Sequence, residues 1–129
     1  PIWIGIFEAN SIMIALNKIK VPRPLTHDLA VNLINKLEGQ LELIIISGLK
    51  EGIYFAELNI RVKNELIKID ARPSDSIAIA VRLDVPIFVN ETLIELMVNL
   101  EEFKSKIVDE HLKTILDNLR EDDFGKYKM

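Results

Sequence analysis

The sequence of 129 residues contains no cysteine. This absence excludes disulfide frameworks, zinc sites with thiolate ligands and thiol nucleophiles. A chain without cysteine suits a reducing compartment, and we expect the protein to be cytoplasmic. Aromatic residues make up only 6% of the chain, with one tryptophan, and there are two histidines. Few side chains are therefore available to stack on nucleic-acid bases or to transfer protons near neutral pH.

Long apolar runs and an excess of positive charge are also missing. Purely apolar runs such as residues 43–46 and 77–81 fall far below the ~20 residues of a membrane-spanning helix, so we expect no membrane partner. Sixteen basic residues against twenty acidic residues give a net charge of −4, which provides no general positive field to attract nucleic acid. Any binding of phosphate must come from a local site.

The residues that are present predict a single globular domain. Hydrophobic residues make up 49% of the chain and charged residues 28%, a balance typical of folded proteins. Residues 2–7 predict a short strand. Apolar residues at three- and four-residue steps then predict a helix over residues 8–19. A second helix is expected to begin at Thr26, as its N-cap, and to end at Gly39 in the left-handed conformation.

Three strands are predicted next, at residues 41–47, 53–62 and 66–71, with short turns between them. Apolar and polar residues alternate in the second strand, so one face of the sheet is buried and the other is in water. This order predicts an antiparallel meander. A helix from Ser74, as its N-cap, to about Leu83, a short strand at residues 86–89 and two closing helices complete the prediction. The fold class is therefore α+β, a meander with several packed helices in one domain.

Two segments of the chain resemble each other. Residues 23–30 and residues 72–78 each contain Arg-Pro, followed by a hydroxyl residue, an aspartate and an apolar helix. The likeness is compatible with a degenerate internal duplication, and also with two independent helix caps.

Both segments could bind a phosphate group. A helix N-terminus offers unpaired N–H groups and the positive end of the helix dipole, and an arginine adds a bidentate partner for phosphate oxygens. Arg23 with Thr26, and Arg72 with Ser74, supply this combination. His27 lies in the first turn of its helix, where the dipole favours a neutral imidazole that can act as a base or a metal ligand. The structural alternative is that the hydroxyls cap the helices, each arginine pairs with an aspartate, and His27 is a surface residue.

Carboxylates form the other candidate group. Asp70 and Asp75 flank Arg72 at the end of a strand and the start of a helix, and Glu8 and Asp28 are possible additions. Carboxylate oxygens suit magnesium or manganese, and such an ion could activate water and neutralise a phosphodiester. The alternative is again a set of structural ion pairs.

Four blocks of the sequence carry a family resemblance. They are Pro1-Ile2-Trp3-Ile4-Gly5 followed by Glu8-Ala9, then residues 23–29, residues 69–78 and residues 86–89. In this order they resemble the bifunctional nuclease domain family, which takes its name from plant members described as cleaving both DNA and RNA. The resemblance implies an α+β fold, nuclease activity and a homodimer.

The resemblance also divides the chain. We expect residues 1–100 to form the family domain without the N-terminal strand pair that usually precedes the first block. We expect residues 101–129 to form a helical extension, whose ending at residues 122–129 is similar to that of some bacterial members.

The combined hypothesis is a metal-assisted hydrolase of DNA or RNA phosphodiester bonds. The candidate metal ligands are Glu8, Asp28, Asp70 and Asp75, and the candidate phosphate-binding residues are Arg23, Thr26, Arg72 and Ser74. The candidate catalytic residues are Asp70, Asp75 and His27, the last as a base or proton shuttle. The alternative is a non-catalytic dimeric module that binds an anion or has a regulatory role. A nuclease requires the carboxylates to meet in an open cleft beside an arginine, whereas closed aspartate–arginine pairs favour the module.

Overall fold

The computed structural model describes the backbone of residues 1–118 and the side chains of residues 1–114. The chain divides into two compact units, Pro1–Glu95 and Leu96–Met129. In chain order the elements are α1 (Ile6–Leu16), α2 (Thr26–Lys36), β1 (Gly39–Lys50), β2 (Ile53–Val62), β3 (Glu65–Ala71), α3 (Pro73–Leu83), β4 (Ile87–Val89), the 3-10 helix η1 (Glu91–Leu96) and α4 (Leu100–Asn118). The expected family-like ending at residues 122–129 lies outside the described residues.

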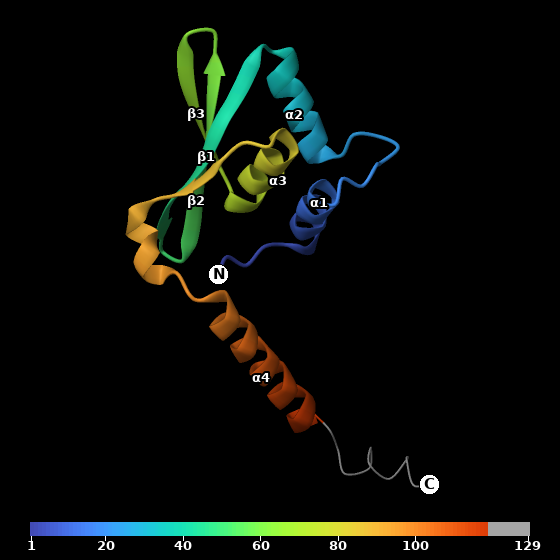
Figure 1. Cartoon of the computed structure of the whole chain (residues 1–129), viewed down its shortest axis with the longest axis vertical. Helices are drawn as coiled ribbons and strands as arrows, with labels where there is room; N and C mark the ends of the chain where they lie inside the picture. The colour runs from blue at the N-terminus through green and yellow to red at the C-terminus, as the bar shows by residue number, and fades with distance from the viewer. Residues whose placement is uncertain (119–129) are drawn as a thin grey trace. The chain divides into compact units, whose positions relative to one another are not determined.

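One mixed sheet of four strands forms the frame of the first unit, with the order β3-β2-β1-β4 (Figure 1). β1, β2 and β3 pair antiparallel, while β4 pairs parallel with β1 through Ile44 and Ile87. Glu51 and Gly52 connect β1 to β2 with φ angles of 52° and 78°, the left-handed conformation of a tight hairpin turn. The predicted α+β fold and its antiparallel meander are thus confirmed.

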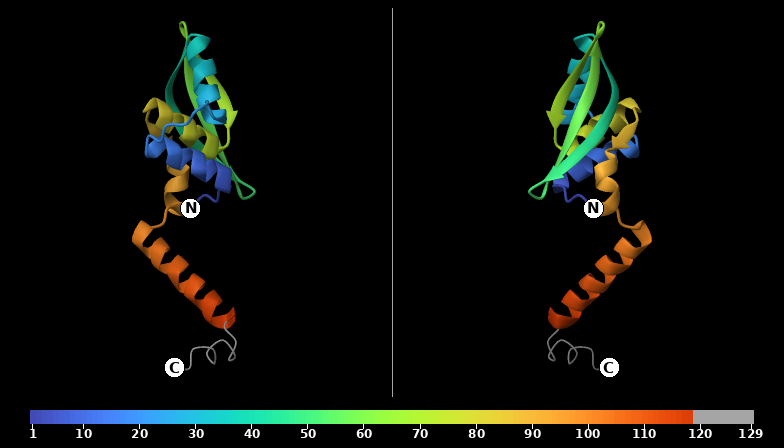
Figure 2. Two further views of the ribbon diagram at one scale, coloured as in Figure 1. Left: turned by 90° about the vertical axis from the view of Figure 1, so that its right-hand side faces the viewer. Right: turned by 90° about the vertical axis from the view of Figure 1, so that its left-hand side faces the viewer.

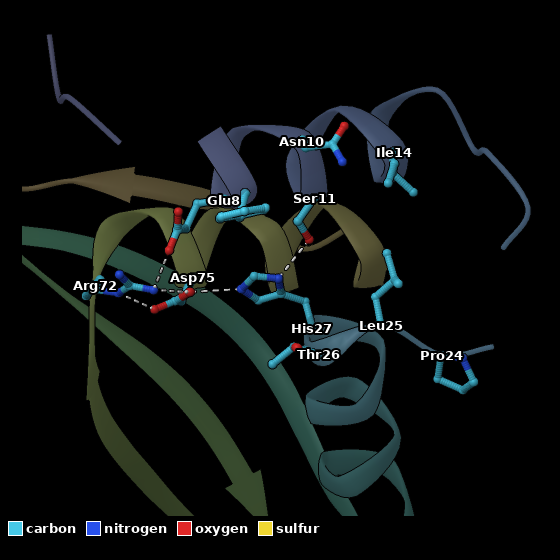
Figure 3. Close-up of a pocket in the computed structure, with 11 residues that line it drawn as sticks. Glu8, Asn10, Ser11, Ile14, Pro24, Leu25, Thr26, His27, Arg72 and Asp75 are labelled. Atoms are coloured by element: carbon cyan, nitrogen blue, oxygen red, sulfur yellow. Dashed lines mark hydrogen bonds and ion pairs between the residues drawn. The ribbon is translucent and has the colours of Figure 1, made fainter. Parts of the chain in front are cut away.

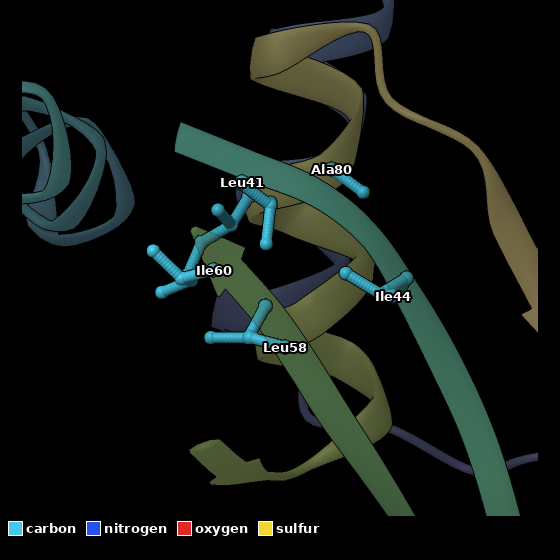
Figure 4. Packing of buried hydrophobic residues seen from close by; sticks show 6 residues of the cluster. Leu41, Ile44, Leu58, Ile60 and Ala80 are labelled. Carbon is cyan, nitrogen blue, oxygen red and sulfur yellow. The ribbon is translucent and has the colours of Figure 1, made fainter. Parts of the chain in front are cut away.

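The helices of the first unit gather on one face of this sheet (Figure 2). α3 packs on β1 and β2, α2 packs on α3 and β1, and α1 packs on α3. The core between sheet and helices is built from Leu41, Ile44, Leu58, Ile60, Ile79 and Ala80 (Figure 4). Since β-strand side chains alternate between faces, the polar residues of β2 lie on the opposite face, where Lys68 of β3 pairs with Glu57.

The beginning of the chain differs from the prediction. Residues 1–5 are irregular and α1 begins at Ile6, so the expected strand over residues 2–7 is wrong. A strand needs a neighbouring strand to bond with, and residues 1–5 pair with none of the four strands of the sheet. α1 also turns a polar side inward: Ser11 is its buried residue, while the predicted apolar stripe leaves Met13 and Leu16 exposed.

The helix ends were also predicted incorrectly in detail. The N-caps of α2 and α3 are Leu25 and Arg72, not the expected hydroxyl residues. Glu38, rather than Gly39, adopts the left-handed conformation after α2, with φ of 61°. Because Pro73 is the first residue of α3 while Pro24 precedes the N-cap of α2, the two Arg-Pro segments occupy different positions at their helices. An internal duplication is not shown.

None of the described helices combines the length and the apolar character that crossing a membrane requires.

The described core predicts that truncation of two side chains of equal size changes the free energy of unfolding by different amounts. Ile44 is completely buried, whereas Leu29 of α2 is largely exposed. Ile44→Ala is expected to lower the free energy of unfolding by about 2–5 kcal/mol through lost contacts and a cavity. Leu29→Ala is expected to change it by less than about 1 kcal/mol. Urea denaturation of both variants checks this, and equal losses would contradict the described core.

Candidate functional site

A cavity of about 570 Å³ lies where α1 meets the N-terminal turns of α2 and α3 (Figure 3). Its lining residues come from three separate parts of the chain and are Phe7, Glu8, Asn10, Ser11, Ile14, Pro24, Leu25, Thr26, His27, Arg72 and Asp75. Apolar side chains form much of the wall, and the polar groups are concentrated around His27 and Arg72. A concave site with a few convergent polar groups is typical of ligand binding and catalysis.

Arg72 holds two carboxylates at the exposed side of the cavity. Its Nε donates to Asp75 Oδ2 at 2.7 Å, and its Nη2 donates to Asp75 Oδ1 and to Glu8 Oε1, each at 3.1 Å. The Arg72 hydrogen bond lowers the pKa of Asp75, while partial burial opposes this and His27 adds to it. Asp75 and Glu8 in turn raise the pKa of Arg72. Asp75 is therefore ionised at neutral pH and its carboxylate can only accept hydrogen bonds.

His27 is bonded at both ring nitrogens. Its Nε2 lies 2.8 Å from Asp75 Oδ1, and its Nδ1 lies 2.7 Å from the Ser11 hydroxyl. Because the Asp75 carboxylate accepts, Nε2 must carry a proton. Arg82 Nη2 donates to the Ser11 oxygen at 3.0 Å, so the Ser11 hydroxyl proton is free to point to Nδ1. A neutral imidazole with its proton on Nε2 satisfies every group of this network.

The inner end of the network is a second arginine–aspartate pair. Arg82 Nε donates to Asp28 Oδ1 at 2.6 Å, and its Nη1 donates to the backbone oxygens of Ala78 and Ser11. The Arg82 side chain is only 8% exposed. The hydrogen bond from Arg82 lowers the pKa of Asp28, and the hydrogen bond from the Leu25 N–H lowers it further, whereas the burial of Asp28 has the opposite effect. The pair is closed, as expected of a structural ion pair.

Together these contacts form one chain of seven side chains. It runs through Glu8, Arg72, Asp75, His27, Ser11, Arg82 and Asp28. The chain connects α1, α2 and α3, and its two ends differ, because Arg72 is 65% exposed and Arg82 is buried. Chemistry with an external ligand is therefore confined to the end that contains Arg72, Asp75 and His27.

Gly5 contributes to the position of Glu8. A Cβ added at Gly5 would collide with the Glu8 carboxylate, which folds back over the start of α1. A glycine at the N-cap thus leaves room for Glu8 to reach Arg72.

The structure brings together five of the sequence-predicted residues. Glu8, Thr26, His27, Arg72 and Asp75 all line the cavity. The other predicted residues lie elsewhere. Asp28 is held by Arg82, Arg23 is exposed in the loop before α2, and Ser74 is buried at the start of α3.

Asp70 is separated from the cavity by the sheet. It pairs in register with Glu57, while its neighbour Ile69 pairs with Leu58 of the core. Because cross-strand partners share a face, Asp70 lies on the polar face of the sheet, opposite to the helices. Its nearness to Arg72 in sequence does not bring it to the cavity.

The carboxylates do not form a ready metal site. Within the part of the chain that the structure describes, no group of three or more histidine, aspartate or glutamate residues could hold a metal ion. Glu8 and Asp75 meet at Arg72, whose guanidinium occupies the position that a cation would take. As arranged, these residues fit an arginine rather than a resident ion.

Sequence reasoning missed Ser11 and Arg82. Both were placed on helices, but their contacts join residues 71 positions apart, which periodicity does not predict. The one available signal was Ser11, a small hydroxyl residue directly before the apolar run of residues 12–16.

The chain is similar in sequence to proteins named as nucleases and to a protein described as uncharacterized. A family model described as the bifunctional nuclease domain matches residues 1–100. An uncharacterized protein of Mycobacterium tuberculosis is 41% identical over 128 residues, which cover 99% of this chain and 73% of that protein. Bifunctional nuclease 2 of Arabidopsis thaliana is 33% identical over 96 residues, which cover 72% of this chain and 29% of the plant protein. Bifunctional nuclease 1 of Oryza sativa subsp. indica is also 33% identical, over 70% of this chain and 29% of its own length.

The lowered pKa of Asp75 predicts a dependence of stability on pH. A carboxyl whose pKa is lower in the folded than in the unfolded state stabilises the fold above its unfolded pKa. This stability is lost as the pH falls through the lower folded pKa. The difference in free energy of unfolding between the wild type and Asp75→Asn should therefore be constant near neutral pH and shrink below about pH 4.

Urea denaturation at a series of pH values measures this difference. Asp28 titrates in both proteins, so its contribution cancels. A difference that stays constant down to pH 2 would show that the Asp75 carboxylate is not held by Arg72.

Proposed function

The chain belongs to the bifunctional nuclease domain family, and we propose that it hydrolyses phosphodiester bonds of DNA or RNA at the cavity around His27. The observation that carries the proposal is the set of contacts that joins an exposed arginine, two carboxylates and a histidine in one open cavity. Relatives that bear the name bifunctional nuclease support the substrate class. Nucleic acid is accordingly the proposed partner.

Arg72 is the proposed phosphate-binding residue. Its Nε and Nη2 donate to Asp75 and Glu8, whereas Nη1 donates to no residue within the described range. The side chain is mostly exposed, and its guanidinium is held by two carboxylates in a fixed orientation. Two N–H groups of Nη1 are thus available to phosphate oxygens, and charge-assisted hydrogen bonds of this kind are among the strong ones. Thr26 lies on the same cavity wall and offers a hydroxyl.

His27 is the proposed proton shuttle, acting through Ser11. The Nδ1 lone pair accepts the Ser11 hydroxyl proton, and Ser11 lines the cavity. When water attacks phosphorus, a P–O bond forms and the bond to the leaving oxygen breaks. The proton of the water passes to the Ser11 oxygen while the Ser11 proton passes to Nδ1. The resulting imidazolium is stabilised by Asp75, and the leaving oxygen takes a proton from solvent.

Asp75 and Glu8 are proposed to act by positioning. Asp75 orients both His27 and Arg72, and Glu8 fixes the other side of the Arg72 guanidinium. A magnesium or manganese ion was expected at these carboxylates. Since they are occupied by Arg72, the proposed proton path contains no metal step. Cleavage in magnesium, manganese or EDTA tests whether the activity requires a metal.

A non-catalytic anion-binding or regulatory module is the second candidate. One observation favours it: each arginine of the network is already paired with an aspartate, Arg72 with Asp75 and Arg82 with Asp28. In this case the network closes the helical layer, and Nη1 of Arg72 holds an anion without cleaving it.

A cytoplasmic homodimer also belongs to the proposal. Ile6 and Phe7 are 79% and 85% exposed on α1, and apolar side chains exposed to this extent suit contact with a second copy of the chain. Sedimentation of the wild type and of Phe7→Ser tests the dimer.

Cleavage of labelled oligonucleotides tests the catalytic proposal. Wild type, His27→Gln and Asp70→Asn are incubated with single-stranded DNA and RNA in magnesium, manganese or EDTA. We expect His27→Gln to lower the rate by at least about 100-fold, because it removes the proton acceptor. Asp70→Asn should retain the rate, because Asp70 lies on the opposite face of the sheet.

Circular dichroism confirms that each variant is folded. Equal trace activity in wild type and His27→Gln would indicate a contaminant and favour the non-catalytic module. If Asp70→Asn loses activity while His27→Gln retains it, Asp70 belongs to the active site and the proposal for the cavity around His27 is wrong.

A further inference from the structure

Arg72 also lines a second cavity of about 340 Å³, a volume at the lower end of the range for small-molecule sites. Its walls are residues 1–5, the turn and first residues of β2, and the beginning of α3. The side chains that matter for binding are Trp3, Tyr54 and Ser74. The two cavities therefore share one arginine and differ in their remaining residues.

Several lining groups of this second cavity are suited to an anion. α3 begins with Pro73, and no side chain caps its N-terminus, so the N–H groups of Ser74 and Asp75 have no partner within the helix. The Ser74 side chain provides an independent second observation. The residue is only 5% exposed and lines the cavity, yet its hydroxyl is bonded to none of the described residues. Nη1 of Arg72 adds two further donors without a partner within that range.

Two aromatic residues also line this cavity. Trp3 is 83% exposed although it is the largest side chain of the protein. Tyr54 is half-buried and packs against the cluster of Ile46, Ala56 and Leu93, which fixes its position. An exposed tryptophan and an anchored tyrosine in one cavity offer a surface on which a flat base can stack.

We propose that this cavity binds one nucleotide of a single-stranded nucleic acid. The base stacks on the aromatic lining of Trp3 and Tyr54. The phosphate binds to Ser74, the first N–H groups of α3 and one N–H of Arg72 Nη1, and the other N–H of Nη1 binds the scissile phosphate. The inference rests on the proposed nuclease function. Since Arg72 lines both cavities, a strand anchored here passes its next phosphodiester to the cavity around His27. A base paired within a duplex cannot reach Trp3, so the substrate is single-stranded.

Trp3 is the single tryptophan of the chain, so its fluorescence reports directly on this cavity. His27→Gln protein is titrated with a short oligothymidylate, with an abasic oligonucleotide of the same length, and with a duplex. We expect saturable quenching by the oligothymidylate and at least about 10-fold weaker binding of the other two, because they offer no free base. Equal quenching by all three probes would overturn the proposal.

Two substitutions with matched controls test the aromatic residues and the anion-binding residues separately. Affinity is measured by the anisotropy of a labelled oligothymidylate. Trp3→Leu should weaken binding by about 5- to 150-fold, the range of one base–aromatic stack, whereas Phe88→Leu, at an exposed aromatic outside both cavities, should leave it unchanged. Ser74→Ala should weaken binding by about 10-fold through loss of a hydrogen bond to phosphate. Its control is Ser76→Ala, which removes a buried hydroxyl that has no partner.

Combination with the cleavage assay distinguishes failure of this inference from failure of the proposed function. If cleavage depends on His27 but Trp3→Leu and Ser74→Ala bind as the wild type does, the second cavity is not the nucleotide site and the nuclease proposal stands. If quenching and the two losses of affinity occur without cleavage, the site is a binding site and the nuclease proposal fails. If neither occurs, both are wrong.

Discussion

The pair of hydrogen bonds at His27 is the constraint on which the arrangement of the three N-terminal helices depends. α1 contributes only Ser11 as a fully buried residue, and its largest apolar side chains face outward, so apolar packing alone holds it weakly. The contact from Ser11 to His27 joins α1 to α2, and that from His27 to Asp75 joins α2 to α3. Buried polar groups are costly when they lose a partner, and this cost makes the three helices mutually dependent.

The same constraint determines the chemistry of the site. Arg72 keeps the Asp75 carboxylate ionised, Asp75 fixes the proton of His27 on Nε2, and Nδ1 is left as an acceptor toward Ser11. Arg82, buried beneath, orients Ser11 from the other side. Both ring nitrogens of His27 and the Ser11 hydroxyl are satisfied, so this part of the network is rigid. The proposed proton path and phosphate site both use this rigidity. The second cavity is the proposed anchor for the strand, since it shares Arg72 with the first.

The sequence predicts those features that depend on local patterns. Alternation in β2 and short turns predicted the meander, and the three-residue spacing of Arg72 and Asp75 placed them together at the start of a helix. Asp70 shows the limit of such reasoning: a shift of one residue along a strand moves a side chain to the other face, and so adjacency to Arg72 was misleading. Ser11 and Arg82 depend on contacts between distant segments. The expected strand at residues 2–7 had the right composition, but these residues pair with none of the four strands of the sheet.

The protonation of the His27 ring tests the central claim most directly. Nitrogen NMR of the ¹⁵N-labelled protein resolves the two ring nitrogens of a histidine, and only two histidines are present, so His27→Gln assigns the signals. For the neutral ring the described network predicts one tautomer, with the proton on Nε2 and none on Nδ1. A proton on Nδ1, or rapid averaging between the two nitrogens, would show that Asp75 and Ser11 do not hold His27 and would contradict the account.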